Sequence, residues 1–384
     1  MRARAVSGGM ALAFTAGFNL ANIGAVAGRI GDAYGVGLGV VGLFTTGLFL
    51  THAALQVPMG RLCDRFGPRI VGGAGLLVVA AASTAALGWR ETWFAIGMRT
   101  ITGIGTAAAF VGGGDYVRAT IGSPVALGFF GAVSMGSGGL ALAVVPLLHG
   151  WRAPFAAAAV AAVAGFCLVA IAPREPRLPA VTRAASVVDR RLLPLAIIHA
   201  ASFGLSVVLG NWVVTLLERS GGESEHVAGL IGGLVLFVGV ISRPLGGRLA
   251  NRPSAIAASF VTGGLAIGVL VAAKPLPLMI VAAAVLGLAA GIPFASALAG
   301  AQRLRPDAPG AAIGAVNMIA ATVILIGTPL LGITFSLPGG GRTGFAVVAV
   351  LYGLAALAVR RDRNPGGGRG SKLVNLVQSA NQVE

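Results

Sequence analysis

The fold of this chain can be predicted from one segment, Gln56-Val-Pro-Met-Gly60-Arg-Leu-Cys-Asp64-Arg65-Phe-Gly67-Pro-Arg69. A long apolar run precedes it, and another begins at Ile70. Because the connection between two runs of membrane-spanning length is so short, it must be a tight helical hairpin. Gly60 and Gly67 lack a Cβ atom and therefore permit close approach and a sharp reversal. The arginines of the segment predict that this turn lies on the cytoplasmic side.

The same pattern returns 187 positions later as Arg243-Pro-Leu-Gly-Gly247-Arg248-Leu249-Ala-Asn251-Arg252. A second echo links Gly131-Ala-Val-Ser134-Met135 to Gly314-Ala-Val-Asn317-Met318, which lies 183 positions further on. The chain therefore consists of two related halves. Duplicated membrane halves are a transporter architecture in which the solute site lies between the halves.

Composition supports the membrane class. Of the 384 residues, 56% are hydrophobic and only 10% are charged, whereas soluble proteins average about 25% charged residues. The net charge of +16 does not indicate nucleic-acid binding, because no aromatic-interleaved basic module accompanies it. Basic residues instead gather in alternate connections between apolar runs, and each outer connection holds only one. This asymmetry places both termini in the cytoplasm.

Twelve spans of about 20 residues are predicted. They cover 8–28, 38–59, 70–88, 93–114, 124–148, 153–172, 192–216, 227–246, 255–273, 275–300, 311–335 and 343–359. The expected organisation is an N-terminal six-helix half (1–172), a cytoplasmic connection (173–191), a C-terminal six-helix half (192–359) and a disordered cytoplasmic tail (360–384).

Motifs of soluble enzymes are missing from the sequence. It has no phosphate-cradling loop with its lysine, no paired-histidine metal motif and no serine elbow. We therefore expect neither an enzyme nor a primary ATP-driven pump. We also expect no cofactor and no metal site, since Cys63 and Cys167 lie in or beside membrane segments.

Gly60-x-Leu62-x-Asp64-Arg65-x-Gly67-x-Arg69 resembles the signature loop between helices 2 and 3 of the major facilitator superfamily. Gly247–Arg252 is similar to that family's loop between helices 8 and 9, and Arg99-x-x-x-Gly103-x-Gly105-x-Ala107 to its helix 4 motif. The resemblance implies an all-α membrane protein of twelve helices in two pseudo-symmetric halves, which transports by alternating access.

The resemblance also implies a gating role for the two loops. Asp64 is expected to hold the outward-facing state closed on the inside, against the start of helix 11 near Pro309–Ala311. Its equivalent, Asn251, has no charge, so the two latches should be unequal. The candidate gating residues are Gly60, Asp64, Arg65, Gly67, Arg69, Gly247, Asn251 and Arg252.

Two arginines are candidates for solute binding. Arg99 lies inside its span, where a cation is costly unless it is paired or hydrated. Asp115 is about 24 Å further along the same helix and cannot pair with it. Arg243 lies near the inner boundary, where its side chain could instead reach the surface. For Arg99, the alternatives are an outward-reaching side chain and hydrogen bonds to helix carbonyls.

Uncharged polar residues within spans complete the candidate solute site. The full set is Arg99, Arg243, Asn22, Gln56, His199, Asn211, Ser134 and Asn317. Each uncharged member could instead join two helices by a hydrogen bond. His52 and His199 are candidates for a coupling proton, although a neutral, hydrogen-bonded histidine is the commoner outcome.

The sequence favours a secondary active transporter of a small solute, with an anion or carboxylate preferred because the membrane region is poor in acids. Arg243-Pro-x-Gly-Gly resembles nitrate/nitrite porters and cyanate-type carriers, although those nitrate carriers have an arginine where this chain has Gln56. One alternative is proton-linked efflux of drugs or other organic compounds, but Gly131–Gly139 lacks the Gly-Pro step typical of antiporters. Another is a membrane sensor or scaffold that does not transport. We expect a monomer in a bacterial cytoplasmic (inner) membrane.

Overall fold

The computed structural model describes residues 2–176, 189–217, 221–223, 225–272 and 275–362. All regular structure in these ranges is helical, so the expected all-α class is confirmed. Most of the predicted connection and nearly all of the predicted tail, residues 177–188 and 363–384, lie outside the described residues.

The first half of the chain forms eight α-helices and two short 3₁₀ turns. The helices are α1 (Arg2–Ala21), α2 (Ala27–Tyr34), α3 (Leu38–Ala54), α4 (Gln56–Phe66), α5 (Pro68–Gly88), α6 (Thr92–Ile121), α7 (Pro124–Val144) and α8 (Ala153–Ala170), with 3₁₀ turns at Gly24–Val26 and Val145–Leu147.

The described part of the second half is also helical and includes a π-helix in its first membrane-spanning segment. It contains a 3₁₀ turn (Arg190–Leu192), α9 (Leu193–His199), the π-helix η4 (Ala200–Leu205), α10 (Ser206–Leu216), α11 (Glu225–Leu249), α12 (Pro253–Ala272), α13 (Leu276–Gly291), α14 (Phe294–Leu304), α15 (Pro309–Ile333), a 3₁₀ turn (Thr334–Ser336), α16 (Arg342–Leu354) and α17 (Ala356–Asp362).

Within the described residues, ten helical segments are long and apolar enough to cross a membrane, and an eleventh results if the bent pair α3–α4 is counted as one span. The expected first span corresponds to α1, which has 20 residues but is not among them. Its arginines and Asn19 lower its mean hydropathy below that of the other spans. The predicted count of twelve is thus reached only if the bent pair α3–α4 is counted as one span and α1 is added.

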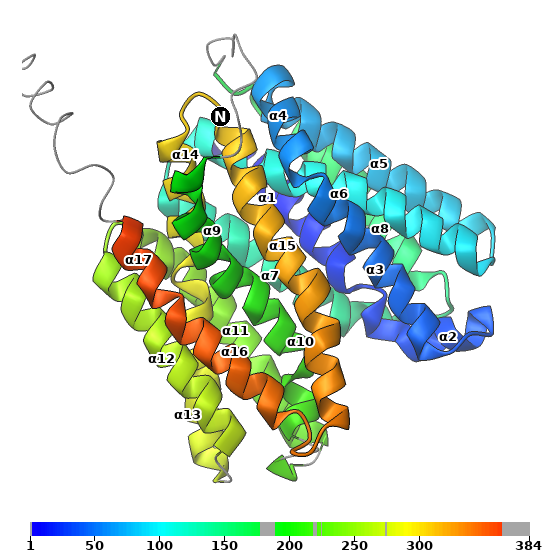
Figure 1. Ribbon diagram of the computed structural model, residues 1–384. Helices are drawn as coiled ribbons and strands as arrows, with labels where there is room; N and C mark the ends of the chain where they lie inside the picture. The colour runs from blue at the N-terminus through cyan, green and yellow to red at the C-terminus, as the bar shows by residue number, and fades with distance from the viewer. Residues whose placement is uncertain (1, 177–188, 218–220, 224, 273–274, 363–384) are drawn as a thin grey trace, which may run out of the picture.

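The end of the molecule that carries the Gly60–Arg69 loop is called the inner end, after the sidedness that the sequence predicts. Figure 1 shows the N-terminus, the end of α4 and the loop after α14 gathered at this end. At the opposite end, α2 and α3 diverge from α10 and α15. The helices of the two halves meet mainly through α4 with α15 and through α7 with α11.

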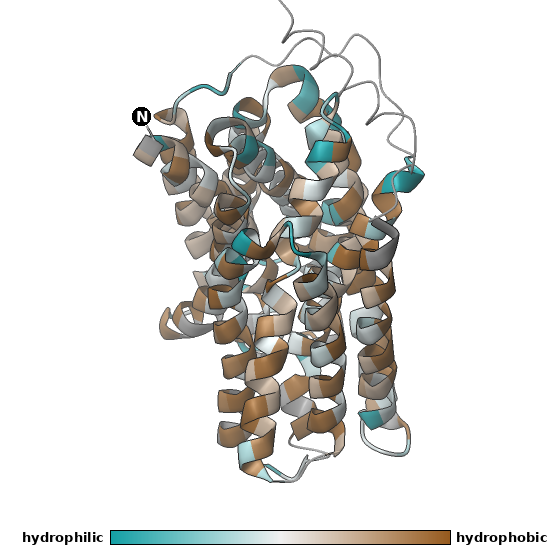
Figure 2. Cartoon of the chain, turned by 90° about the vertical axis from the view of Figure 1, so that its left-hand side faces the viewer, coloured by the Kyte–Doolittle hydropathy of each residue, from teal (hydrophilic) through white to brown (hydrophobic). Residues whose placement is uncertain are grey.

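The polar and apolar surfaces are segregated along the helix axes. Figure 2 shows apolar residues covering the long helices and hydrophilic residues concentrated near the inner end. Large apolar side chains such as Phe237, Leu265 and Val281 are exposed on the helix flanks. In a soluble protein such surface would be a liability, whereas in a membrane it faces lipid.

Candidate solute site and inner latches

The first latch joins α4 to the start of α15. Both carboxylate oxygens of Asp64 accept hydrogen bonds from backbone N–H groups, Oδ1 from Gly310 at 2.8 Å and Oδ2 from Ala311 at 2.9 Å. These groups lie in the first turn of a 25-residue helix, whose dipole favours a negative charge at this end. The contact that the family resemblance predicted is therefore present in the structure.

Close helix packing accompanies this charge. Gly60 is buried against α15, and a Cβ atom at this position would overlap the Gly310 carbonyl and the Ala311 Cα. Because neither side has room for a side chain, the Asp64 carboxylate reaches the first turn of α15 directly.

The remaining residues of the first loop hold the first half together. Gly67 has φ of 93°, which favours glycine, and forms the turn before α5. Arg69 donates from Nε to the Val169 carbonyl at 3.0 Å and from Nη2 to the Ala170 carbonyl at 2.5 Å. It thereby caps the end of α8. Arg65 is exposed, with its guanidinium 5.0 Å from the centre of the Phe66 ring.

The second latch joins α11 to the start of α7. Gly247 is buried, and a Cβ atom there would overlap the backbone of Pro124 and Val125. Asn251 and Arg252 are exposed. Among the described residues no side-chain hydrogen bond is made by Asn251. The second latch thus keeps the close packing of the first without its charged contact.

A further ion pair lies in the loop that leads into the first latch. Arg305 donates to the carboxylate of Asp307 from Nε at 3.0 Å and from Nη2 at 2.8 Å. These hydrogen bonds hold the pKa of Asp307 below its usual value. The pair fixes the loop only three residues before Gly310.

Arg243 lies at the centre of the contact between the halves. Its side chain is buried, and its guanidinium carbon lies 4.4 Å from the centre of the Phe294 ring and 5.7 Å from that of Phe203. Its Nη1 donates to the carbonyl of Gly131 in the first half. Among the described residues no carboxylate pairs with it, and its Nε has no hydrogen-bond partner. Arg243 does not extend to the surface, which was the alternative.

Polar atoms without described partners lie on the same aromatic cluster as this arginine. His199 packs its ring 5.3 Å from Phe294 and 5.5 Å from Phe203, and its Nε2 lies 3.0 Å from Asn317 Oδ1. The other ring nitrogen of His199 and the amide nitrogen of Asn317 are buried without a described partner. Buried polar atoms rarely lack a partner unless they serve a function or bind unseen water or ligand.

Gln56 begins α4 in the first half and lies against α15, the helix that carries Asn317. Its carbonyl lies against Gly314, one turn before Asn317 on α15. Its Nε2 donates to the His52 carbonyl at 2.8 Å and bridges the 49° bend at Leu55, while its Oε1 has no described partner. The structure thus links Arg243, His199 and Asn317 through shared ring contacts and a hydrogen bond, and places the backbone of Gln56 against α15 one turn from Asn317.

Arg99 lies elsewhere. It is buried, and it donates from Nη2 to the Asn19 carbonyl at 2.7 Å, with Nη1 3.5 Å from Asn19 Oδ1. Among the described residues no carboxylate pairs with it. Measured along their helices from the outer ends, Arg99 lies about 10 Å deep and Arg243 about 27 Å deep. The structure therefore does not place the two arginines at one point.

The other candidates contact neighbouring helices. Asn22 donates to the Pro154 carbonyl at 2.9 Å, and Asn211 Nδ2 lies 3.4 Å from the Thr328 hydroxyl. Ser134 is buried where Gly17 of α1 passes its carbonyl. The Asn22 and Asn211 contacts are the helix-bridging hydrogen bonds of the alternative interpretation, whereas the contact at Ser134 is backbone packing. His52 is buried within the first half, with Nδ1 3.0 Å from Thr106 Oγ1.

Sequence reasoning missed the aromatic part of the site. Phe110 of the first half stacks on Phe203 at 6.0 Å, and Phe203 contacts Phe294 at 6.2 Å. The resulting aromatic cluster spans the boundary between the halves, and the Arg243 guanidinium lies against Phe203 and Phe294. The only available signal was that Phe110 and Phe203 lie in predicted spans that also carry Arg99 and His199, whereas the predicted span of Phe294 carries no candidate.

Comparison with known proteins agrees with this architecture. The model of the Major Facilitator Superfamily matches residues 9–258 and, again, residues 195–376. No curated protein matches the chain. The two matches overlap over residues 195–258 and together cover nearly the whole chain. This chain belongs to the Major Facilitator Superfamily and is a multi-pass membrane transporter.

Proposed function

We propose that this protein is a secondary active transporter of a small anion or carboxylate in a bacterial cytoplasmic membrane, acting as a monomer with both termini cytoplasmic. The observation that carries the proposal is Arg243, a buried guanidinium without a described carboxylate partner, between the two halves. An unpaired cation in the membrane interior is costly, and an anionic solute would neutralise it. Guanidinium donates in a planar fork, which suits nitrate-like ions and carboxylates.

The surrounding groups could complete a small polar site. The Asn317 amide nitrogen is an unpartnered donor, and His199 has an unpartnered ring nitrogen that donates once it is protonated. The rings of Phe203 and Phe294 lie against the Arg243 guanidinium and shield it from water. Desolvation strengthens each charge-assisted hydrogen bond to a bound anion.

Arg243 also connects solute binding to the inner closure. It belongs to the second half but donates to the Gly131 carbonyl of the first half. Separation of the halves at the inner end would break that bond and free a donor. In the proposed cycle, the latches therefore hold the inner end closed in the outward-facing state, and their opening exposes Arg243 to the cytoplasm.

His199 is the candidate for a coupling proton. It packs on the same two rings as Arg243 and keeps one ring nitrogen unpartnered. A proton on this nitrogen would place a second positive charge beside the anion site. Proton and anion would then stabilise each other, which is the requirement for symport.

Arg99 enters the proposal as a second contact on the outer side. Its Asn19 partner is neutral, so its charge remains uncompensated among the described residues. An anion that enters from outside would meet Arg99 before it reaches Arg243.

The test is uptake of nitrate, nitrite, cyanate and small carboxylates into proteoliposomes, with and without a pH gradient. Arg243→Gln should weaken the apparent affinity about 10- to 100-fold, because one charge-assisted hydrogen bond contributes about 1.5–3 kcal/mol. Arg99→Gln should reduce uptake by a smaller factor. Arg90→Gln is the matched control, since Arg90 is an exposed arginine in an outer connection.

The outcomes separate the alternatives. If Arg99→Gln and Arg243→Gln both leave anion uptake intact, the anion assignment is wrong. Export of lipophilic cations driven by a pH gradient would instead identify an efflux carrier. Absence of uptake across the panel, in a protein that binds a partner, would indicate a sensor or scaffold. His199→Gln should remove the effect of the pH gradient on uptake and weaken anion binding, because His199 belongs to the proposed solute site.

A further inference from the structure

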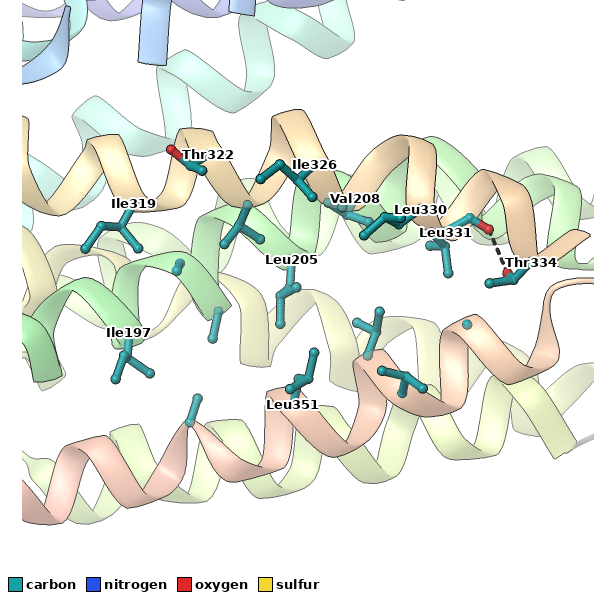
Figure 3. A pocket seen from close by; sticks show the side chains of 18 of the residues that line it. Ile197, Leu205, Val208, Ile319, Thr322, Ile326, Leu330, Leu331, Thr334 and Leu351 are labelled. Atoms are coloured by element: carbon teal, nitrogen blue, oxygen red, sulfur yellow. Dashed lines mark hydrogen bonds between the residues drawn. The ribbon is translucent and has the colours of Figure 1, made fainter. Parts of the chain in front are cut away.

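A lateral groove of about 580 Å³ lies between α9–α10, α15 and α16. Figure 3 shows Ile197 and Leu205 facing Leu351 across it, with Ile326 and Leu330 along α15. All three walls belong to membrane-spanning segments. The solvent around this groove is therefore lipid.

The groove offers almost nothing to a polar ligand. Of the residues that line it, only Thr322, Thr334 and Thr343 carry a polar side chain. Two of these hydroxyls already donate within their own helix, Thr322 to Met318 at 2.8 Å and Thr334 to Leu331 at 2.6 Å. Water in such a groove would lack partners, and an empty groove would forfeit dispersion contacts along its walls.

The length of the groove fits an acyl chain. Its lining on α16 runs from Thr343, near the outer end, to Ala355, just beyond the helix, a distance of about 18 Å. One leaflet of the hydrocarbon core is about 15 Å deep. Arg342 begins α16 directly before Thr343, so a cation lies at the outer end, where the phosphate of an outer-leaflet lipid would be.

We propose that this groove binds one acyl chain of an outer-leaflet phospholipid, with the lipid phosphate beside Arg342. The proposal is independent of the transported solute. A chain held here would contact α9, η4 and α15, the same elements that carry His199 and Asn317. Phospholipid occupancy would thus support the packing of the second half around the solute site.

The test compares two tryptophan substitutions on one helix. Val347 lines the groove and is 54% exposed, whereas Val350 is 61% exposed on the same helix and does not line it. Val347→Trp should fill the groove, and Val350→Trp should leave it open. Native mass spectrometry during titration with phosphatidylglycerol should show one tightly retained lipid in the wild type and in Val350→Trp. Val347→Trp should bind that lipid at least tenfold more weakly.

A second arm tests the headgroup. Arg342→Gln should weaken phosphatidylglycerol binding several-fold and leave diacylglycerol binding unchanged, because diacylglycerol has no phosphate. In bilayers, a phospholipid spin-labelled near the end of its chain should show a restricted component that Val347→Trp removes. Equal lipid retention by the wild type and both tryptophan variants would overturn the proposal. A wild-type dimer that Val347→Trp dissociates would also overturn it, since a second copy would then occupy the groove.

Discussion

The two inner latches have the same origin in the sequence and differ in their chemistry. Both place a buried glycine against the first turn of a helix from the other half, Gly60 against α15 and Gly247 against α7. Only the first adds a carboxylate, and Asp64 accepts two backbone hydrogen bonds there. In the second, Asn251 is exposed.

This difference separates two contributions to closure. Glycine packing sets how closely the halves can approach and is shared by both latches. Charge at a helix N-terminus adds a directional attraction, and only one latch has it. In the proposed cycle both contacts must break, so a second carboxylate would make opening harder. We infer that the asymmetry keeps the closed state stable but reversible.

The largest expected effect comes from removing the shared packing. Gly60→Val and Gly247→Val should each prevent inner closure, because a side chain would overlap backbone atoms that cannot move aside. Transport should fall by more than tenfold in both. The inner-end distance between spin labels at Ile70→Cys and Arg303→Cys should lengthen.

Gly268→Val is the control for these two variants, since Gly268 lies inside α12 with open space around its Cβ position. It should retain transport and the wild-type distance distribution. A closed inner end in Gly60→Val or Gly247→Val would mean that close glycine packing is not required.

The next effect comes from the charge of the first latch. Asp64→Asn keeps a similar shape but removes the carboxylate, and we expect a loss of about 1.5–3 kcal/mol of closure. The inward-facing population should rise about tenfold or more in the same spin-label measurement. Asn251→Ala should change it far less; a comparable change in both variants would show that the latches are not unequal.

A smaller gain is expected from adding a charge to the second latch. Asn251→Asp places a carboxylate near the start of α7 and should favour closure by about 0.3–1 kcal/mol. Combined with Asp64→Asn, it should restore part of the closed population. Asn251→Gln, which is uncharged, should restore none of it, and rescue by that variant would contradict the electrostatic explanation.

The smallest effect concerns the loop before the first latch. Asp307→Asn should lower the stability of the closed inner end by about 0.2–1 kcal/mol at neutral pH, as expected for the loss of an exposed ion pair. Because Arg305 lowers the pKa of Asp307, this contribution is present above the usual carboxyl pKa and is lost as the pH falls through the lowered value. The difference in closed population between the wild type and Asp307→Asn, measured with the same spin labels, should thus be equal at pH 8 and pH 5. A difference that disappears already at pH 6 would contradict this.

Predictions from the sequence were most successful where one local pattern has one solution. The Gly60–Arg69 loop, its echo at Gly247 and the apolar runs predicted the helical hairpins and the superfamily. The same patterns did not predict two irregularities of the helices that depend on packing. The break at Leu55 and the π-helix at Ala200–Leu205 leave no periodic signal, because both depend on contacts with other helices.

The candidate site shows the same division. Arg243, His199, Gln56 and Asn317 were identified individually as polar groups in apolar spans. Nothing in the sequence indicated that Phe203 and Phe294 lie against Arg243, or that Gly131 supplies its one described hydrogen bond. Arg99 was grouped with Arg243 because both are intramembrane arginines, yet their depths differ.

By itself, the sequence determined the class of the protein, its duplicated halves and the charge difference between the latches, since these follow from hydropathy, repetition and residue identity. Only the tertiary structure decided which polar groups share a site. Helices separated by more than a hundred residues must first pack before Arg243 can meet Gly131, or His199 can meet Asn317. How deep a residue lies in the membrane and which helix it faces depend on how the helices pack, so neither can be deduced from a single segment of the sequence.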